Sequence, residues 1–359
     1  MSFRASTRQL YAANLWLRSA TRVVVRIDRF RATSFSELEA ALRDVPWSTW
    51  IPRRAPVRVR VASHGSKLYH TDAIEERVLR VLDRPVSTPG AGGHRNPSGP
   101  ADPPDPGDDQ LADDEDAAQL ILVRVNHDEV TVSIDSSGAP LSRRGYRLQS
   151  AKAPLRETLA AALLLASGWD GSVPLIDPLC GSGTIVIEAA LLARSIPPGQ
   201  HRAFRFGEWP TFEPGTWASV GAEAESKILE PCPVPIIGTD RDAGAIRAAT
   251  ANAERADVLA DLELREAPVS ELHAPSEAVA DGTGWIITNP PYGTRVGGPD
   301  LRDLYARLGQ VAREQVPGWH LGMLVADHRL AGQTKVRLEE RLRVSNGGLR
   351  VSYVIGPVT

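Results

Sequence analysis

Hydrophobic and polar positions follow two different patterns along the chain. In the first pattern, short runs rich in β-branched residues, partly alternating with polar ones, predict strands over residues 23–27, 57–61, 120–125 and 129–135. Apolar residues at helical spacing after Ser34 and after Thr71 predict two helices between these strands. The resulting order β-α-β-α-β-β predicts a small α+β domain.

The second pattern begins near Pro154, where short apolar runs alternate with longer helical segments. Strands are expected over residues 173–177, 236–240, 262–264, 285–287, 321–326 and 349–355, with helices over 154–166, 185–194, 243–256 and 300–315. This alternation predicts an α/β fold with a Rossmann-like, doubly wound and mainly parallel sheet. Asn346-Gly347-Gly348 is a turn signal, so a strand before it would form a hairpin with the last strand.

These patterns predict two domains, over residues 1–148 and 149–359. Residues 1–14 show no clear element, and residues 196–233 are interpreted as a long insertion containing Pro and aromatic residues. Residues 86–118 are rich in Pro, Gly and Asp, a composition that cannot bury enough apolar surface to order itself, so we expect a disordered acidic insertion there.

Composition excludes several classes of protein. No run of eighteen apolar residues predicts a membrane span, and the N-terminus lacks the apolar segment of a signal peptide. The two cysteines, Cys180 and Cys232, are far apart, which argues against a disulfide framework or a zinc site and is consistent with a reducing cytoplasm. We therefore expect a cytoplasmic protein with no metal site; the oligomeric state is not indicated.

Charge is distributed unevenly, although the net charge is only −3. Residues 1–100 hold 17 Lys and Arg against 8 Asp and Glu, whereas residues 101–119 hold 8 acids and no base. A basic N-terminal half is typical of a nucleic-acid partner. The alternative is that arginine is simply the default surface cation of this protein.

The most informative stretch for chemistry is Asn289-Pro290-Pro291-Tyr292, which follows the apolar run ending at Ile287. Two prolines cannot continue a strand, so the turn lies at a strand's carboxyl end, where open α/β sheets bind ligands. An amide, a proline carbonyl and an aromatic ring could together hold and stack a base that carries an exocyclic amine. The alternative is an ordinary turn with a capping Asn.

A second candidate loop joins a strand to a helix. It comprises Asp177, Pro178, Leu179, Cys180, Gly181, Ser182, Gly183 and Thr184. The loop matches neither the dinucleotide fingerprint nor a P-loop, which disfavours a pyrophosphate ligand. A carboxylate beside closely approaching glycines suits a cationic nucleoside ligand such as S-adenosylmethionine.

Asp240 ends the next predicted strand. Its carboxylate could accept hydrogen bonds from a ribose diol, or it could cap the following helix. We favour the ribose role because Asp242 is available as the cap.

Together these segments resemble the class I S-adenosylmethionine-dependent methyltransferases that methylate amines, and more closely the THUMP-domain RNA guanine-N2 methyltransferases. The shared pattern includes Arg144-Gly145-Tyr146-Arg147, Leu155-Arg156-Glu157, the Asp177 loop, Asn289-Pro290-Pro291-Tyr292 and Asn346-Gly347-Gly348-Leu349. The resemblance covers essentially the whole chain. It implies a THUMP RNA-binding module over about residues 20–135, followed by the catalytic domain.

The resemblance also implies roles for particular residues. Asn289, Pro290, Pro291 and Tyr292 would be catalytic; cofactor binding would involve Arg156, Glu157, Thr158, Asp177, Pro178, Cys180, Gly181, Ser182, Gly183, Thr184, Asp240, Arg241 and Asn289. The candidate RNA contacts are Arg53, Arg54, Lys67, Arg143 and Arg144, although surface solvation is the alternative for each one. The RNA could be ribosomal or transfer RNA.

The chain departs from this family in three places. The first strand and helix of the usual N-terminal ferredoxin-like region are not found, and Glu266-Ala267-Pro268 occupies the position of the usual acidic residue after the third strand. The acidic insertion over residues 101–118 is not typical of the family. Two other functions remain open: a DNA adenine-N6 or protein glutamine methyltransferase, which share the Asn-Pro-Pro-Tyr turn, and an RNA-binding protein without catalysis.

Overall fold

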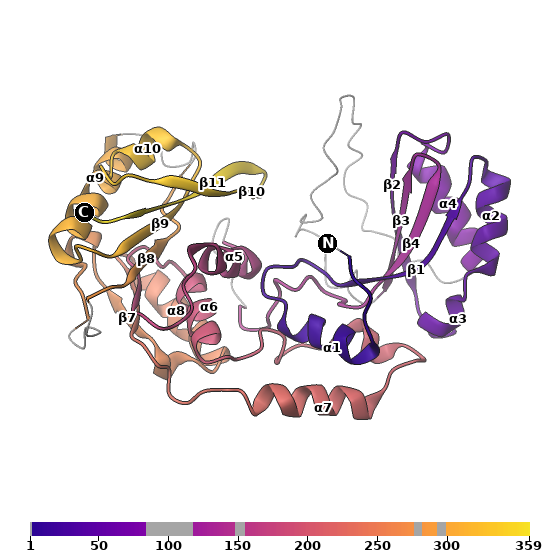
Figure 1. The fold of residues 1–359 in the computed structure, drawn as a ribbon, viewed down its shortest axis with the longest axis horizontal. Helices are drawn as coiled ribbons and strands as arrows, with labels where there is room; N and C mark the ends of the chain where they lie inside the picture. Colours follow the sequence, from indigo (N-terminus) through magenta and orange to yellow (C-terminus); the bar gives the residue numbers. More distant parts are fainter. Residues whose placement is uncertain (1, 84–117, 148–154, 276–281, 293–298) are drawn as a thin grey trace. The chain divides into compact units, whose positions relative to one another are not determined.

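The computed structural model describes residues 2–83, 118–147, 155–275, 282–292 and 299–359 (Figure 1). The chain forms two compact units that are not separated by a single cut in the sequence. The N-terminal unit contains Met1–Leu15, Ala20–Leu141 and Arg202–Val220; the C-terminal unit contains Trp16–Ser19, Ser142–His201 and Gly221–Thr359. The expected domain boundary and nearly all of the expected acidic insertion lie outside the described residues.

The N-terminal unit is built on a four-stranded sheet of order β1-β4-β3-β2, in which only β2 and β3 are parallel. Its elements are α1 (Thr7–Trp16), β1 (Val24–Arg31), α2 (Phe35–Asp44), α3 (Trp47–Trp50), β2 (Val57–His64), α4 (Thr71–Leu82), β3 (Gln119–Asn126) and β4 (Glu129–Asp135). The expected β-α-β-α-β-β order is confirmed, with the short α3 in addition. Ser34 caps α2 as predicted, accepting a hydrogen bond from the Glu37 amide.

Besides α3, two helices that contribute to this unit were not predicted. Residues 1–14 contain most of α1, and the expected insertion contains α7 (Pro214–Glu225) and a 3₁₀ turn, η2 (Arg205–Glu208). The reason is long-range packing: Tyr11 of α1 stacks on Phe206 with 4.3 Å between ring centroids, and Phe212 and Trp217 complete the cluster. These partners lie about two hundred residues along the chain from Tyr11, so no local pattern reveals them.

The C-terminal unit is built on a seven-stranded sheet of order β10-β11-β9-β8-β5-β6-β7. Its strands are β5 (Leu175–Asp177), β6 (Ile236–Asp240), β7 (Glu263–Glu266), β8 (Trp285–Thr288), β9 (His320–Val325), β10 (Glu339–Asn346) and β11 (Leu349–Pro357). Strands β5 to β9 are parallel, whereas β11 runs antiparallel to both β9 and β10. This confirms the Rossmann-like α/β class and the C-terminal hairpin.

Helices cover both faces of this sheet, so its central strands are apolar on both sides. The helices are α5 (Glu157–Ser167), α6 (Thr184–Ala193), α8 (Ala243–Arg255), α9 (Pro299–Gln315) and α10 (His328–Gly332); η3 (Leu259–Asp261) and η4 (Val269–Glu271) are short turns. Leu175 and Ile287 belong to the core that also contains α5 and α6, whereas Ile176 and Ile286 belong to the core that contains α9. The alternation of neighbouring residues between two cores explains why these strands are continuous apolar runs in the sequence.

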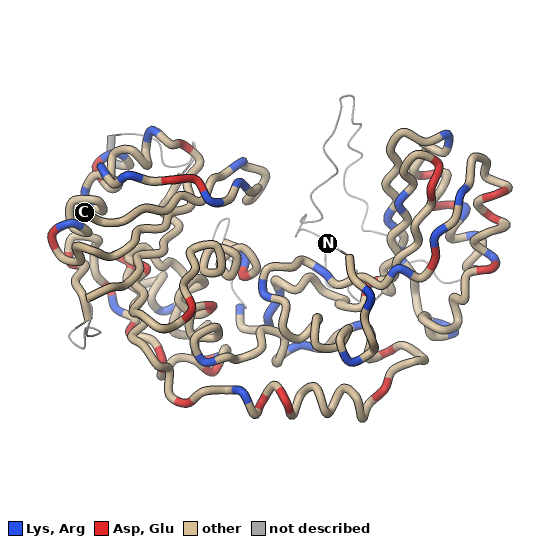
Figure 2. The backbone as a smooth tube through the Cα atoms, viewed as in Figure 1, with Lys and Arg blue, Asp and Glu red and all other residues tan. Residues whose placement is uncertain are grey.

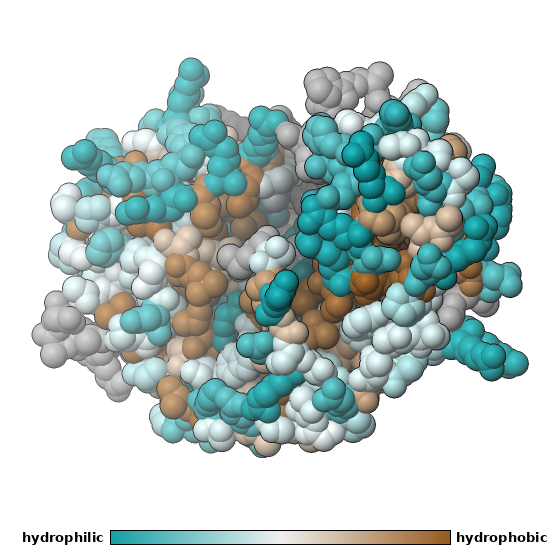
Figure 3. Space-filling model, turned by 45° about the vertical axis from the view of Figure 1, so that its right-hand side comes forward, coloured by the Kyte–Doolittle hydropathy of each residue, from teal (hydrophilic) through white to brown (hydrophobic). Residues whose placement is uncertain are grey.

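Charged residues are distributed along the backbone of both units (Figure 2), and on the face drawn in Figure 3 hydrophobic residues show between hydrophilic ones. No helix within the described residues is long and apolar enough to cross a membrane.

Candidate functional site

Three neighbouring parallel strands bring the predicted chemical groups to one edge of the C-terminal sheet. Strand β5 lies between β8 and β6, and the strand order proceeds from β5 in opposite directions on its two sides. Such a switch point is where open α/β sheets bind ligands, at the carboxyl ends of the strands. Those ends carry Asp177, Asp240 and Asn289, which directly follows β8.

The loop after β5 is joined to the end of β6 by backbone hydrogen bonds. The Gly181 N–H donates to Oδ2 of Asp240 at 3.0 Å, and the Cys180 N–H donates to the Thr239 carbonyl at 2.9 Å. Gly181 and Gly183 have φ values of 54° and 83°, in the left-handed region that glycine tolerates. A Cβ on Gly183 would lie 3.0 Å from the Ala249 Cβ, whereas a Cβ on Gly181 would meet nothing within 4 Å. Gly183 is therefore required for packing, and Gly181 leaves open space for a ligand.

Asp177 lies at the base of this loop and is almost completely buried, with 1% exposure. Its Oδ1 accepts a hydrogen bond from the Leu179 N–H at 3.2 Å. Burial raises the pKa of Asp177 to about 7, and the nearby Asp240 carboxylate adds to the rise. A carboxyl group with a pKa in this range would be stabilised in its charged form by a cationic ligand.

Asp240 is partly exposed, and its carboxylate accepts hydrogen bonds from two backbone N–H groups. Besides the bond from Gly181, its Oδ1 accepts from the Asp242 N–H at 3.0 Å. Asp242 caps α8, accepting from the Gly244 N–H at 2.7 Å, as the sequence predicted. Asp240 is thus fixed at the site without serving as the helix cap, which leaves it available to a ligand.

The turn after β8 carries an unpaired acceptor. The side-chain oxygen Oδ1 of Asn289 is buried and has no hydrogen-bond partner among the residues that the structure describes. A buried polar atom without a partner is costly, so it marks a position where a ligand donor would be favoured. An exocyclic amine is such a donor.

Tyr292 is held by a residue for which the sequence predicted no role in the site. Asn346, the last residue of β10, donates from Nδ2 to the Tyr292 hydroxyl at 2.6 Å. The neighbouring Tyr305 donates to the Pro291 carbonyl at 3.4 Å. In the sequence, Asn346 was recognisable as part of a turn and of the family resemblance, but neither indicated its neighbour in space.

Arg147 connects two of the segments assigned to cofactor binding. Its Nε lies 3.3 Å from Oε1 of Glu157, and the same guanidinium donates to the Thr184 hydroxyl at 2.5 Å and to the Leu155 carbonyl at 2.9 Å. Burial raises the pKa of Glu157 to about 7, although Arg147 opposes the rise. Glu157 and Thr184 are therefore held together behind the loop.

The other residues in the expected cofactor set differ in exposure. Pro178, Cys180 and Thr158 are buried, Arg156 and Ser182 are partly exposed, and Arg241 is exposed. The Ser182 carbonyl accepts from Asn252 at 3.0 Å, which fixes the loop from the side of α8. Burial raises the pKa of the Cys180 thiol, which disfavours a thiolate role.

The expected RNA contacts are divided between the two units and do not form a cluster within either of them. Arg53 and Arg54 are exposed just before β2, Lys67 is exposed beyond the other end of that strand, and Arg143 is partly exposed. An exposed role for Arg144 is wrong. Only 3% of it is exposed, its Nε lies 3.4 Å from Oε1 of the fully buried Glu188, and it also donates to the Arg18 carbonyl.

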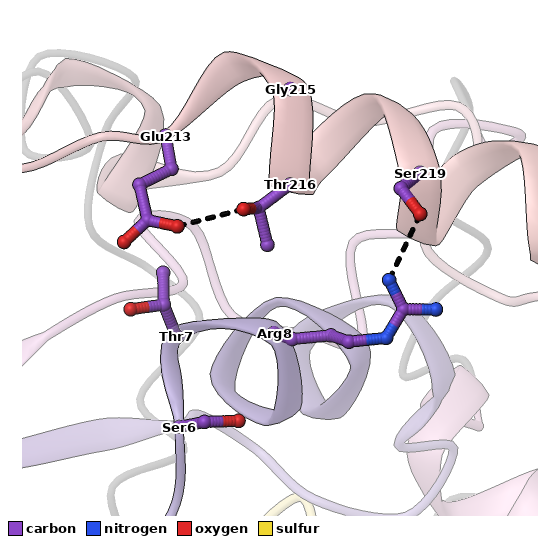
Figure 4. Close-up of a pocket in the computed structure, with 7 residues that line it drawn as sticks. All are labelled: Ser6, Thr7, Arg8, Glu213, Gly215, Thr216 and Ser219. Carbon is purple, nitrogen blue, oxygen red and sulfur yellow. Dashed lines mark hydrogen bonds between the residues drawn. The ribbon is translucent and has the colours of Figure 1, made fainter.

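A surface pocket of about 450 Å³ lies in the N-terminal unit. It is lined by residues at the starts of α1 and α7, among them Arg8, which donates to the Ser219 hydroxyl at 3.0 Å (Figure 4). No group of three or more His, Cys, Asp or Glu side chains within the described residues is placed to hold a metal ion.

The sequence of this chain is similar to those of known proteins. The chain is 35% identical over 357 residues to "Ribosomal RNA large subunit methyltransferase K/L" of Syntrophotalea carbinolica, and 34% identical over 347 residues to the protein of the same name from Marinomonas sp.. These matches cover 97% and 95% of the chain but 48% and 46% of the relatives, so the chain spans about half the length of the curated relatives it matches.

Two solved structures are similar over nearly the whole chain. A Listeria monocytogenes protein, described as a predicted N6-adenine-specific DNA methylase, has a TM-score of 0.79 at 30% identity, with 98% of this chain and 87% of that chain covered. The protein SMU.472, solved with SAH, has a TM-score of 0.77 at 27% identity, with 99% and 89% covered. The RMKL-like methyltransferase domain matches residues 144–353, which is more than half of the chain, and the chain therefore belongs to the family of proteins that carry this domain.

Proposed function

We propose that this protein transfers a methyl group from S-adenosylmethionine to the exocyclic N2 of a guanosine in large-subunit ribosomal RNA. In this proposal the C-terminal unit is the catalytic domain, and the N-terminal unit is a THUMP-type RNA-binding domain. The observation that carries the proposal is the unpaired, buried Asn289 Oδ1, which lies at the end of a strand adjacent to the one that ends in Asp177. A cytoplasmic site of action follows from the proposed substrate.

The residues around β5 and β6 fit the cofactor. Gly181 offers open space for close approach, Asp240 is positioned to accept hydrogen bonds from a ribose diol, and Asp177 can favour a positive charge nearby. When bound there, S-adenosylmethionine would supply a methyl group on a positively charged sulfur.

The turn after β8 fits the acceptor base. Asn289 Oδ1 and the Pro290 carbonyl would accept the two N–H groups of the guanine amine, and Tyr292 would stack on the base. The amine nitrogen forms the new bond to the methyl carbon while the carbon–sulfur bond breaks, and the nitrogen then loses a proton to water. No strong base is needed because the nitrogen becomes acidic as the bond forms, so positioning dominates the rate.

The N-terminal sheet supports an RNA substrate. One face of this sheet packs on the helices through residues such as Val130, Val132 and Ile134, which are completely buried. The opposite face carries arginines in register. Arg26 and Arg29 of β1 lie opposite Ser133 and Thr131 of β4, and Arg124 of β3 also lies opposite Thr131.

This face contains more cations than acids. The exposed arginines are Arg26, Arg29, Arg31 and Arg124, with Arg60 partly exposed. Strand β4 contributes two acids at these alternate positions: Glu129 pairs with Arg29, and the buried Asp135 pairs with Arg22. Within the described chain, Arg26, Arg31 and Arg124 form no ion pair. Figure 2 marks these strands' basic positions in blue. Spaced guanidinium groups on an open face fit the phosphates of a nucleic acid.

Ribosomal RNA is favoured over transfer RNA because the curated relatives carry ribosomal RNA in their names. The second candidate is adenine-N6 methylation of DNA, which is favoured by the description of the Listeria structure. The turn would hold adenine N6 as well as guanine N2. Mass spectrometry of nucleosides from ribosomal RNA, transfer RNA and DNA, with and without the gene, separates these three substrates.

The site assignment is tested by a pair of variants. Asn289→Ala should leave the affinity for S-adenosylmethionine nearly unchanged in calorimetry and reduce methyl transfer to ribosomal RNA about 100-fold or more, since it removes a positioning contact. Asp240→Ala should instead weaken cofactor binding. Glu339→Gln, an exposed change in β10, is the control. Unchanged methyl transfer by Asn289→Ala would rule out the assignment.

A further inference from the structure

The hairpin formed by β10 and β11 extends beyond the sheet that anchors it (Figure 1). Residues Ser352–Pro357 of β11 pair with β9, but the three residues before them pair only with the end of β10. The turn itself is two residues long, Gly347 and Gly348, with φ values of 57° and 79°. A narrow turn of this kind produces a thin, well-defined tip.

The tip combines an exposed apolar side chain with basic charge. Leu349 is 49% exposed. From Leu342 to Val351 the hairpin carries Arg343 and Arg350 and no acidic residue. The Arg343 side chain is 71% exposed and pairs at 2.9 Å with Glu340, which lies farther from the tip.

The tip is connected directly to the candidate acceptor site. Asn346 lies opposite Leu349 in the hairpin register, and its side chain holds the Tyr292 hydroxyl at 2.6 Å. The exposed leucine is therefore one cross-strand pair away from the residue that anchors the proposed stacking ring.

We propose that this hairpin tip binds the RNA strand that flanks the methylated nucleotide. Leu349 would occupy the space left in the base stack when the target base turns out, Arg343 and Arg350 would contact neighbouring phosphates, and Asn346 would position Tyr292 against the base. This inference rests on the proposed function. It is supported by the complementary charge of RNA and by the exposure of an apolar residue beside the site.

The role of Leu349 is tested with substrates that differ in the free energy needed to turn out the target base. The substrates are two RNA fragments that contain the mapped target, one with the target guanine paired and one with it opposite a mismatch. Turning out a paired base costs a few kcal/mol, and a mismatched base costs less. Leu349→Ala should therefore reduce kcat about tenfold on the paired fragment and much less on the mismatched one.

The matched control is Leu229→Ala, which truncates a leucine of 50% exposure elsewhere in the same unit and should leave both rates unchanged. Affinity for S-adenosylmethionine should be normal in both variants. If the wild-type protein does not methylate RNA, the proposed function fails. If the wild type is active and Leu349→Ala is fully active, or equally slow on both fragments, the inference fails and a protein-binding role for the leucine becomes the better explanation.

The positioning role of Asn346 has a separate test. Asn346→Ala should lower kcat without changing cofactor affinity. The same change in a Tyr292→Phe background should have little further effect, because the hydroxyl that Asn346 holds is already absent. Additive losses in the double variant would contradict positioning through Tyr292.

Discussion

The two units of this molecule present their candidate functional side chains in opposite ways. At the strand ends of the C-terminal unit, short side chains such as Asp177, Asp240 and Asn289 are buried or partly buried and lie on or directly after a strand. On the open face of the N-terminal sheet, long arginine side chains extend from adjacent strands into solvent. The first arrangement makes function depend on single atoms, whereas the second makes it depend on the sum of many weak contacts.

The two units should differ most in the unfolding free energy that is lost when one ion pair of each unit is broken. Glu188→Ala leaves Arg144 buried without its carboxylate, and loss of one partner from a buried pair costs about 3–5 kcal/mol in unfolding free energy. Arg29→Ala breaks the exposed pair with Glu129 and should cause no measurable change. Urea unfolding, followed by hydrogen exchange of peptides from each unit, measures both. Equal losses would mean that Arg144 is not confined as the structure shows.

The two glycines of the β5 loop separate packing from binding within one unit. Gly183→Ala should destabilise the C-terminal unit by about 2 kcal/mol, because the backbone is left-handed and the new Cβ would crowd Ala249. Gly181→Ala faces open space, so its cost in stability should be smaller, while affinity for S-adenosylmethionine should fall as the Cβ enters the approach path. Thermal unfolding and calorimetry on the same samples report the two effects. If Gly181→Ala instead caused the larger loss of stability and Gly183→Ala the larger loss of affinity, the roles assigned to the two glycines would be wrong.

The same contrast governs what the sequence could predict. In the C-terminal unit, the strand ends were recognisable because short apolar runs stop at a carboxylate or at Asn-Pro-Pro, and parallel strands bring such ends together. The fold class and the capping role of Asp242 were predicted for the same reason: the signals are local. The hydrogen bond between Asn346 and Tyr292 joins residues far apart in the chain, and no local pattern encodes it.

The sequence showed which segments are rich in arginine, but not where the arginine side chains lie in the structure. Arg144 of the C-terminal unit was a candidate RNA contact, yet Glu188 and the Arg18 carbonyl hold it in the interior. In the N-terminal unit, the sequence predicted the strands, but strand order is needed to place Arg26, Arg29 and Arg124 on the same face.

Helix α1 was missed for a related reason. Its aromatic partners come from residues 206–217, so the apolar face of the helix is completed by a distant part of the chain. Local periodicity within residues 1–14 carries no sign of those partners.

A change of pH should affect the site of the C-terminal unit in particular, because the pKa of Asp177 lies near neutrality. Ionisation of Asp177, with a pKa of about 7, should raise affinity for the positively charged cofactor as pH increases from about 6 to about 8. Asp177→Asn should remove the part of this dependence that belongs to the protein, and comparing the two proteins also cancels any titration of the ligand. Calorimetry at several pH values measures this pH dependence. If affinity changes with pH in the same way in the two proteins, Asp177 is not the group whose ionisation raises the affinity.

The stability contribution of Asp177 has the opposite sign. Its folded pKa lies above the ordinary value, so the folded state holds a proton that the unfolded state releases. Without cofactor, the stability of the C-terminal unit should therefore fall as pH rises from about 4, near the ordinary carboxyl pKa, to about 7. Asp177→Asn should flatten this decline in urea unfolding.

The smallest effects should come from single arginines of the N-terminal sheet, and their additivity is the informative result. Removing one arginine that binds a phosphate should lower the slope of log affinity against log salt concentration by about 0.7–0.9. Arg26→Ala and Arg124→Ala should each weaken binding of ribosomal RNA modestly, the double variant should show the sum, and kcat at saturating RNA should not change. Arg53→Ala with Arg54→Ala is the competing pair, because these residues were also candidate RNA contacts and are exposed but lie outside the sheet face. If this pair changes the salt slope and the sheet pair does not, RNA contacts the residues before β2, and the open face serves another purpose.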